Sequence, residues 1–259
     1  MTNINFVHFK FLPMSMRVLF SMVLIVFGTG YLMAMIQVWE NHAGKDGKPM
    51  LTAKDLMISY SGNPEGTKME AALRASMADM LPAEKREVLF NWLHAGAPQD
   101  QFESTANPII QEHCVMCHNP DANPHLPNFT SYEGVSKVTA KDEGMTIHTL
   151  VRVSHIHLFS ITFIFFIVGY IFTHAYVRPT WLKCALIAAP FVVLLTDVAS
   201  WYLTKVWSGF AWVVIGSGAI MGMSFAAMWF ISMWQMWIGK VPTEVSDKGG
   251  QVPCVHMDN

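Results

Sequence analysis

Along this chain one long apolar stretch is followed by a long polar stretch and then by three further apolar stretches. Four stretches are each long enough to cross the hydrocarbon core of a bilayer, which takes about 20 helical residues for about 30 Å. They are residues 18–39, 156–176, 184–203 and 210–238. Residues 40–152 hold 25 of the 36 charged residues. The pattern predicts an all-α membrane protein with four spans, one N-terminal and three C-terminal, and a polar domain outside the membrane.

The average composition conceals this division. Hydrophobic residues make up 52% and charged residues 14% of the 259 positions, whereas a soluble domain has about 25% charged residues. The polar stretch alone has 10 basic and 15 acidic residues, a net charge of −5, and nothing in it favours nucleic acid as a partner. We expect a cytoplasmic N-terminus and first span in residues 1–39, the polar domain in 40–152, a three-span domain in 153–238 and a flexible cytoplasmic tail in 239–259.

Basic residues in the short loops predict the orientation, because Lys and Arg are enriched on the cytoplasmic side. They precede the first span, separate the second from the third and follow the fourth: Lys10, Arg17, Arg178, Lys183, Lys240 and Lys248. If all four helices span, these positions share one side of the membrane. Both termini are then expected in the cytoplasm of a bacterium and the polar domain in the periplasm. The first apolar run is longer than a signal peptide needs and no clear cleavage site follows it, so we interpret it as a retained anchor.

The polar stretch contains a motif typical of covalent haem attachment. Residues 114–118 read Cys-Val-Met-Cys-His, the attachment sequence of c-type haem. Cys114 and Cys117 would each form a thioether to a haem vinyl group, and His118 would bind the iron as proximal ligand. A zinc site would need a second ligand pair at metal spacing, and a thioredoxin-like site would need a βαβ pattern. Because c-type haem is attached outside the cytoplasmic membrane, where this motif is expected, we predict one haem c.

Residues 68–140 resemble the cytochrome c superfamily. Residues 107–113 are similar to the short helix that precedes haem attachment there, and residues 119–124 form a turn-rich stretch like the loop that leaves the haem. In the family a ligand methionine and a last helix follow the motif. Here residues 77–93 resemble that ligand loop and helix but precede the motif, so the resemblance implies a permuted helical haem domain. Its helix is expected to start near Pro82 and to end at Gly96.

The sixth iron ligand follows from this resemblance. Met77 is the first candidate, because it lies about as far ahead of the helix as the family's methionine does, and Met80 is the second. Histidine alternatives are His94, His148 and His155. The chain has 19 methionines, and a methionine is more often a packing residue than a ligand.

Ionisable residues inside the spans are the next candidates for function, because lipid disfavours them. His155 and His157 are expected at the start of the second span, His174 at its end, and Asp197 in the outer half of the third. One interpretation is that the histidines are interfacial residues without a cofactor. A b-type haem is another, but His157 and His174 are about 25 Å apart along one helix, so it would need a second subunit. A third is a quinol site in which His155, His157 and Asp197 accept protons near the haem.

Two further features concern the helices themselves. Gly218 and Gly222 are four residues apart in the fourth span, a spacing that permits close helix approach within a larger membrane complex. Six tryptophans, Trp201 among them, lie near expected helix ends, as is typical of a membrane interface.

These observations favour an electron-transfer subunit of a membrane oxidoreductase or respiratory complex rather than an independent enzyme. It would pass single electrons at the periplasmic face, from quinol or to a soluble cytochrome or copper protein attracted by the net charge of −5, and other membrane subunits would surround it. A non-catalytic assembly or scaffold subunit with a structural or sensory haem is the alternative. An enzyme with a five-coordinate haem is a third hypothesis.

Overall fold

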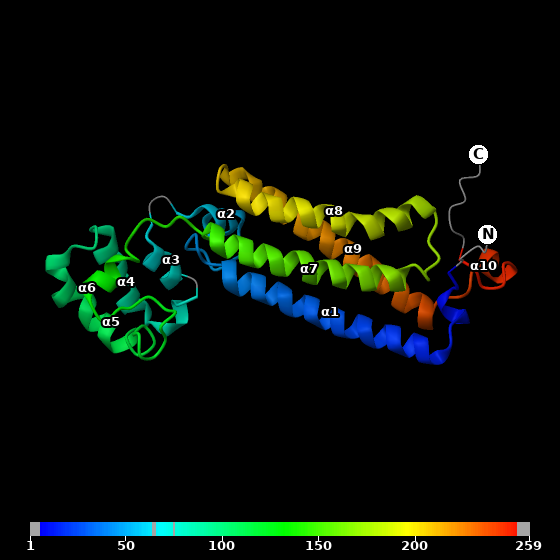
Figure 1. The fold of residues 1–259 in the computed structure, drawn as a ribbon, viewed down its shortest axis with the longest axis horizontal. Coiled ribbons are helices and arrows are strands. Elements are labelled where there is room, and N and C mark those ends of the chain that lie inside the picture. Colours follow the sequence, from blue (N-terminus) through cyan, green and yellow to red (C-terminus); the bar gives the residue numbers. More distant parts are fainter. Residues whose placement is uncertain (1–5, 64–65, 75, 253–259) are drawn as a thin grey trace. The chain divides into compact units, whose positions relative to one another are not determined.

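The computed structural model describes residues 6–63, 66–74 and 76–252, and within these ranges β-structure is confined to two isolated bridges (Figure 1). The predicted all-α class is confirmed. The chain separates into two compact units. The membrane unit consists of residues 1–35, 148–202 and 212–259, and the polar unit consists of residues 36–147 and 203–211.

Four helices in the described ranges are long and apolar enough to cross a membrane, which confirms the four predicted spans. They are α1 (Met14–His42), α7 (Ile147–Phe172), α8 (Thr180–Thr204) and α9 (Ala211–Trp237) (Figure 1). The most apolar 18-residue window of each has a mean hydropathy between 1.7 and 2.1. The chain is therefore a multi-pass membrane protein.

Helix α7 begins and ends earlier than the apolar pattern predicted. The predicted span starts at residue 156, whereas the helix runs from Ile147 to Phe172. Hydropathy marks the apolar part of a helix, but the backbone hydrogen bonds of the helix continue through the polar residues before it. In consequence His155 and His157 lie more than two turns inside α7 and not at its start, and His174 lies just beyond its end.

Glycine makes room for a side chain of the facing helix at two points between α1 and α9. A Cβ atom on Gly28 would lie 3.1 Å from Nε1 of Trp229, and one on Gly222 would overlap the hydroxyl of Tyr31. At Gly218, by contrast, a Cβ would meet no described atom within 4 Å.

The two terminal segments pair with each other beside the helix ends of the membrane unit. The N–H of His8 donates to the Gly250 carbonyl and the N–H of Val252 to the Phe6 carbonyl, both at 2.8 Å. The short helix α10 (Thr243–Asp247) precedes this pairing. Residues 239–252 of the expected tail thus include helix α10 and two backbone hydrogen bonds to the N-terminal segment, while residues 253–259 lie outside the described ranges.

The described residues of the polar unit form five short α-helices (Figure 1): α2 (Ala53–Ser61), α3 (Lys68–Arg74), α4 (Ala83–His94), α5 (Asn107–His113) and α6 (Tyr132–Ser136). The predicted helices α4 and α5 are both confirmed. Pro82 is the N-cap of α4, and Gly96 after its end has a φ of 90°, which glycine adopts without strain. The short helix α6 follows the haem motif.

One apolar core holds the polar unit together. It draws mainly on α4, on α5 and on the π-helical turn Phe102–Ala106 before α5. Its buried members are Met69, Leu73, Leu81, Leu89, Phe90, Trp92, Leu93, Ala97, Phe102, Ala106, Ile109, Ile110, Phe129 and Val135. The helix before the motif and the helix expected to belong to the ligand-bearing half thus share one core.

Lys205 ties the α8–α9 connection to the rest of the polar unit. Its ammonium donates to the carbonyl oxygens of Tyr60 at 3.1 Å and of Glu143 and Met145 at 2.8 Å each. Hydrogen bonds from a charged donor are among the stronger ones in proteins. This explains why a lysine occupies a loop that the charge pattern assigns to the outer side.

Candidate functional site

The haem motif continues directly from the end of α5. Cys114 is the C-cap of α5, and its N–H donates to the Ile110 carbonyl at 2.9 Å. The turn then closes on itself, since the N–H groups of Cys117 and His118 both donate to the Cys114 carbonyl, at 3.1 and 2.9 Å. The two cysteines are free thiols about one turn apart. The chain therefore presents two sulfur atoms and an imidazole from one turn of backbone.

The two thiols differ in their surroundings. Cys117 is exposed, whereas Cys114 is half-buried and packs against the core of the polar unit together with Val115. Burial raises the pKa of the Cys114 thiol, because a thiolate is poorly solvated there. Between the cysteines Met116 is 80% exposed. One thiol is thus anchored to the fold and the other is open to a bulky reactant.

A backbone carbonyl fixes the orientation of His118. Its Nδ1 lies 3.1 Å from the Pro127 oxygen, and because a carbonyl only accepts, Nδ1 donates. The neutral ring then carries its free lone pair on Nε2, the tautomer in which imidazole binds a metal. The ring also stacks on Phe129, with centroids 4.3 Å apart and planes 6° from parallel. The geometry of His118 fits a proximal haem ligand.

The candidates for the sixth ligand are held very differently. Met77 is partly buried and packs against the same core as Cys114, whereas Met80 is 68% exposed. His94 places its Nε2 3.2 Å from a carboxylate oxygen of Glu70. His148 and His155 are exposed residues of α7 in the membrane unit. Among these residues, Met77 shares the surroundings of the motif.

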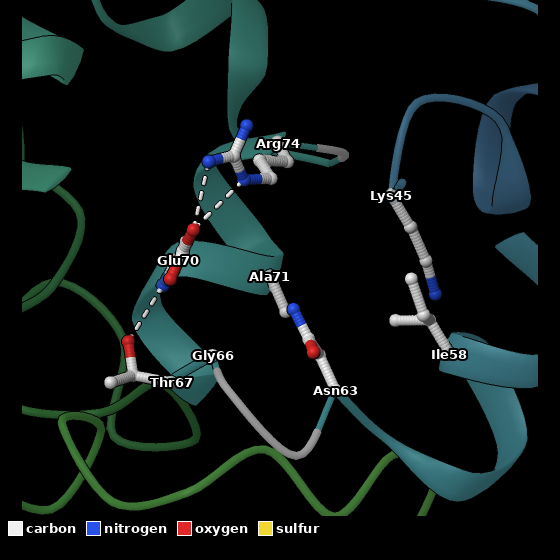
Figure 2. Close-up of a pocket in the computed structure, with 8 residues that line it drawn as sticks. All are labelled: Lys45, Ile58, Asn63, Gly66, Thr67, Glu70, Ala71 and Arg74. Atoms are coloured by element: carbon white, nitrogen blue, oxygen red, sulfur yellow. Dashed lines mark hydrogen bonds and ion pairs between the residues drawn. The ribbon is translucent and has the colours of Figure 1, made fainter. Parts of the chain in front are cut away.

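A small cavity of the polar unit lies beside Glu70 (Figure 2). Its volume of about 10 Å³ is the room of about one water molecule. Glu70 is buried and accepts from Nε and Nη2 of Arg74, at 3.0 and 2.8 Å (Figure 2). Glu70 and Arg74 were not among the predicted functional residues, although Glu and Arg four residues apart on a helix are a recognisable signal. The cavity is too small for a cofactor, and the ion pair serves the fold.

Asp197 and His157 are brought to the same indole ring in the membrane unit. The His157 ring on α7 meets the Trp201 ring on α8 edge-on, with centroids 5.1 Å apart. Asp197, only 6% exposed, interacts with Trp201 from one turn earlier on α8. Trp201 was expected at the interface but is 5% exposed. The sequence missed its role because a tryptophan near a helix end usually faces the interface, and only the packing of α7 shows otherwise.

His155 and His174 do not belong to this cluster. His155 is exposed and its ring lies against Phe159 of its own helix. His174 donates from Nδ1 to the Val7 carbonyl at 2.7 Å, and its Nε2 is buried without a hydrogen-bond partner in the described part of the chain. Four aromatic rings surround it, those of Phe6, Phe9, Phe20 and Tyr170. Of the four ionisable residues that were considered together in the sequence, the structure therefore brings only His157 and Asp197 to one place.

The three C-terminal spans with their adjoining segments form a recognisable sequence unit. Residues 130–243 match a family of transmembrane helical domains. The match covers α7, α8 and α9 and leaves out the haem motif at residues 114–118. No curated protein and no solved structure matches the chain. The comparison supports the membrane-spanning nature of this part of the chain.

Proposed function

We propose that this protein is a membrane-integrated c-type cytochrome that carries single electrons as a subunit of a larger membrane oxidoreductase, such as a respiratory complex. The observation that carries the proposal is the motif turn: two free thiols one turn apart, followed by a histidine whose Nδ1 is fixed by a carbonyl. The resemblance of residues 68–140 to the cytochrome c superfamily points the same way.

Each residue of the turn has a distinct task in this proposal. Cys114 and Cys117 hold the porphyrin through two thioether bonds, and His118 offers Nε2 to the iron. The Pro127 carbonyl keeps the imidazole in the required tautomer, and the stacked Phe129 ring limits its rotation. When bound, haem supplies a one-electron change of iron oxidation state.

Met77 is the proposed sixth ligand. Its support is the packing of its side chain against the core that also holds Cys114, since a ligand held by the fold loses little conformational entropy when it binds. Two protein ligands leave no open position for a substrate, and this favours electron transfer over an enzyme with a five-coordinate haem.

The proposed setting is the inner membrane of a bacterium, with the polar unit in the periplasm and both termini in the cytoplasm, as the distribution of Lys and Arg supports. One helix would be enough to anchor a cytochrome, so four helices favour contact with other membrane subunits. The net charge of −5 on residues 40–152 would attract a basic soluble cytochrome or copper protein.

Haem staining of the denatured chain tests the attachment. In a host that attaches c-type haem, the wild-type chain should retain haem on a denaturing gel and contain one haem by pyridine haemochrome assay. Cys114→Ala and Cys117→Ala should each lower the covalently held haem several-fold. Cys184→Ala is the matched control, because Cys184 is a free exposed thiol on α8, and it should leave the haem unchanged. A wild-type chain without bound haem overturns the proposal.

A further inference from the structure

Buried polar side chains gather between α7 and α8 near the end of α8 at Thr204. Ser154, Asp197 and Trp201 are each less than 10% exposed. Ser154 is also hydrogen-bonded across the helix pair to the hydroxyl of Tyr202, at 3.0 Å. An ionisable residue in a membrane-spanning helix is costly and usually marks a functional site. Asp197 forms no ion pair within the described ranges, so no structural charge pair explains its presence.

His157 adds a second hydrogen-bond acceptor on the facing helix. Its Nδ1 lies 3.1 Å from the Val153 carbonyl of its own helix and therefore donates to it. The neutral ring then has its lone pair on Nε2. Trp201 contacts the His157 ring on one helix and Asp197 on its own. Two acceptors of different chemistry thus contact one indole ring.

Exposed apolar side chains adjoin the cluster in sequence. Ile156, next to His157 on α7, is 53% exposed, and Leu195, two residues before Asp197 on α8, is 65% exposed. A ligand that reaches the cluster from the lipid would meet apolar side chains first, which suits a hydrocarbon tail.

We propose that Asp197, His157 and Trp201 bind the headgroup of a membrane-soluble quinol. A quinol headgroup is a planar aromatic ring with two hydroxyl donors, which match the carboxyl of Asp197 and Nε2 of His157, while the indole packs against the ring. The inference rests on the proposed function, since it names the class of electron donor. It differs from the sequence hypothesis by including Trp201 and excluding His155.

Binding of decylhydroquinone to the full-length protein in lipid nanodiscs tests the site. The protein is first reduced chemically so that the quinol stays reduced, and binding is followed by quenching of tryptophan fluorescence against empty nanodiscs. Asp197→Asn and His157→Gln should each weaken binding about tenfold or more, as the loss of a hydrogen bond to a strong acceptor does. His155→Gln is the matched control on the same helix and should change the affinity less than about twofold.

Quinol affinity, thermal unfolding and haem content of the same variants together decide the outcome. Unchanged affinity in Asp197→Asn and His157→Gln overturns the inference, and so does an equal loss in His155→Gln. Thermal unfolding of each variant separates a lost contact from a lost fold, because the near-isosteric Asn should keep the wild-type transition. Haem content of the same samples separates the two proposals: haem without quinol binding overturns only this inference, and quinol binding without haem overturns only the proposed function.

Discussion

Met77 and Met80 illustrate how packing distinguishes two chemically identical candidates. Both precede α4, but only Met77 packs against the core of the polar unit, and Met80 is 68% exposed. Met77→Ala should therefore remove the near-infrared and EPR signature of methionine ligation from the haem-bound protein. Met80→Ala should leave these spectra unchanged. A Met77→Ala spectrum identical to the wild type would exclude Met77 as the ligand.

His174 is a second residue whose surroundings determine its chemistry. Burial lowers its pKa below the usual 6.5, the Lys183 ammonium lowers it further, and the bond from Nδ1 to Val7 raises it. The nearby His8 also has a lowered pKa, because it is buried, while its bond to Gln235 opposes the shift and Lys10, His174 and Lys183 add to it. The folded protein thus resists protonation of both rings.

The pairing of the two terminal segments should therefore depend on pH. For a histidine with a lowered folded pKa, stability is fully present above 6.5 and is lost as pH falls from there through the folded pKa, since the unfolded segment binds the proton more readily. Amide hydrogen exchange of residues 6–12 and 250–252 should accelerate when pH falls from about 7.5 to about 5. A double variant, His8→Gln and His174→Gln, should lose most of this dependence. Equal pH dependence in that variant would contradict the assignment.

Helices show a similar division between what pattern reveals and what packing decides. The helix α4 could be predicted because an apolar face, a proline near the start and a glycine stop are local signals, whereas α5 was expected from the resemblance to the cytochrome c superfamily. The early start of α7 and the helix α10 could not be predicted, because polar residues at helix ends give no periodic apolar signal. The environment of His174 could not be predicted for another reason, because it depends on a contact with Val7, which is 167 residues away in sequence.

The α1–α9 contact gives a test at the level of helix packing. Gly222→Val should destabilise the membrane unit by about 1–3 kcal/mol, because the added side chain overlaps Tyr31 of α1. Gly218→Val is the matched control on the same helix, since a Cβ there meets no described atom within 4 Å, and it should be nearly neutral. Thermal unfolding in detergent micelles measures both. A greater loss for Gly218→Val would show that α9 faces α1 differently.

The chain as a whole combines two chemical regimes that its average composition hides. A charge-poor membrane part makes Asp197 and His157 conspicuous, and a charged polar unit carries the motif turn. The sequence alone was sufficient for the four spans, and it identifies the Cys-x-x-Cys-His residues as candidates for haem attachment. It was not sufficient for the cluster around Trp201, because contacts between helices depend on how they rotate and pack, which a hydropathy pattern does not encode.

The mass of the intact chain, purified from membranes of a host that attaches c-type haem, decides whether Cys114 and Cys117 carry the cofactor. We expect the mass of the polypeptide plus one haem, with the added mass on the peptide that contains residues 114–118. The haem should be absent when both cysteines are replaced by alanine. A chain with the mass of the bare polypeptide, or one in which the two cysteines form a disulfide, would contradict the proposal that this protein is a c-type cytochrome.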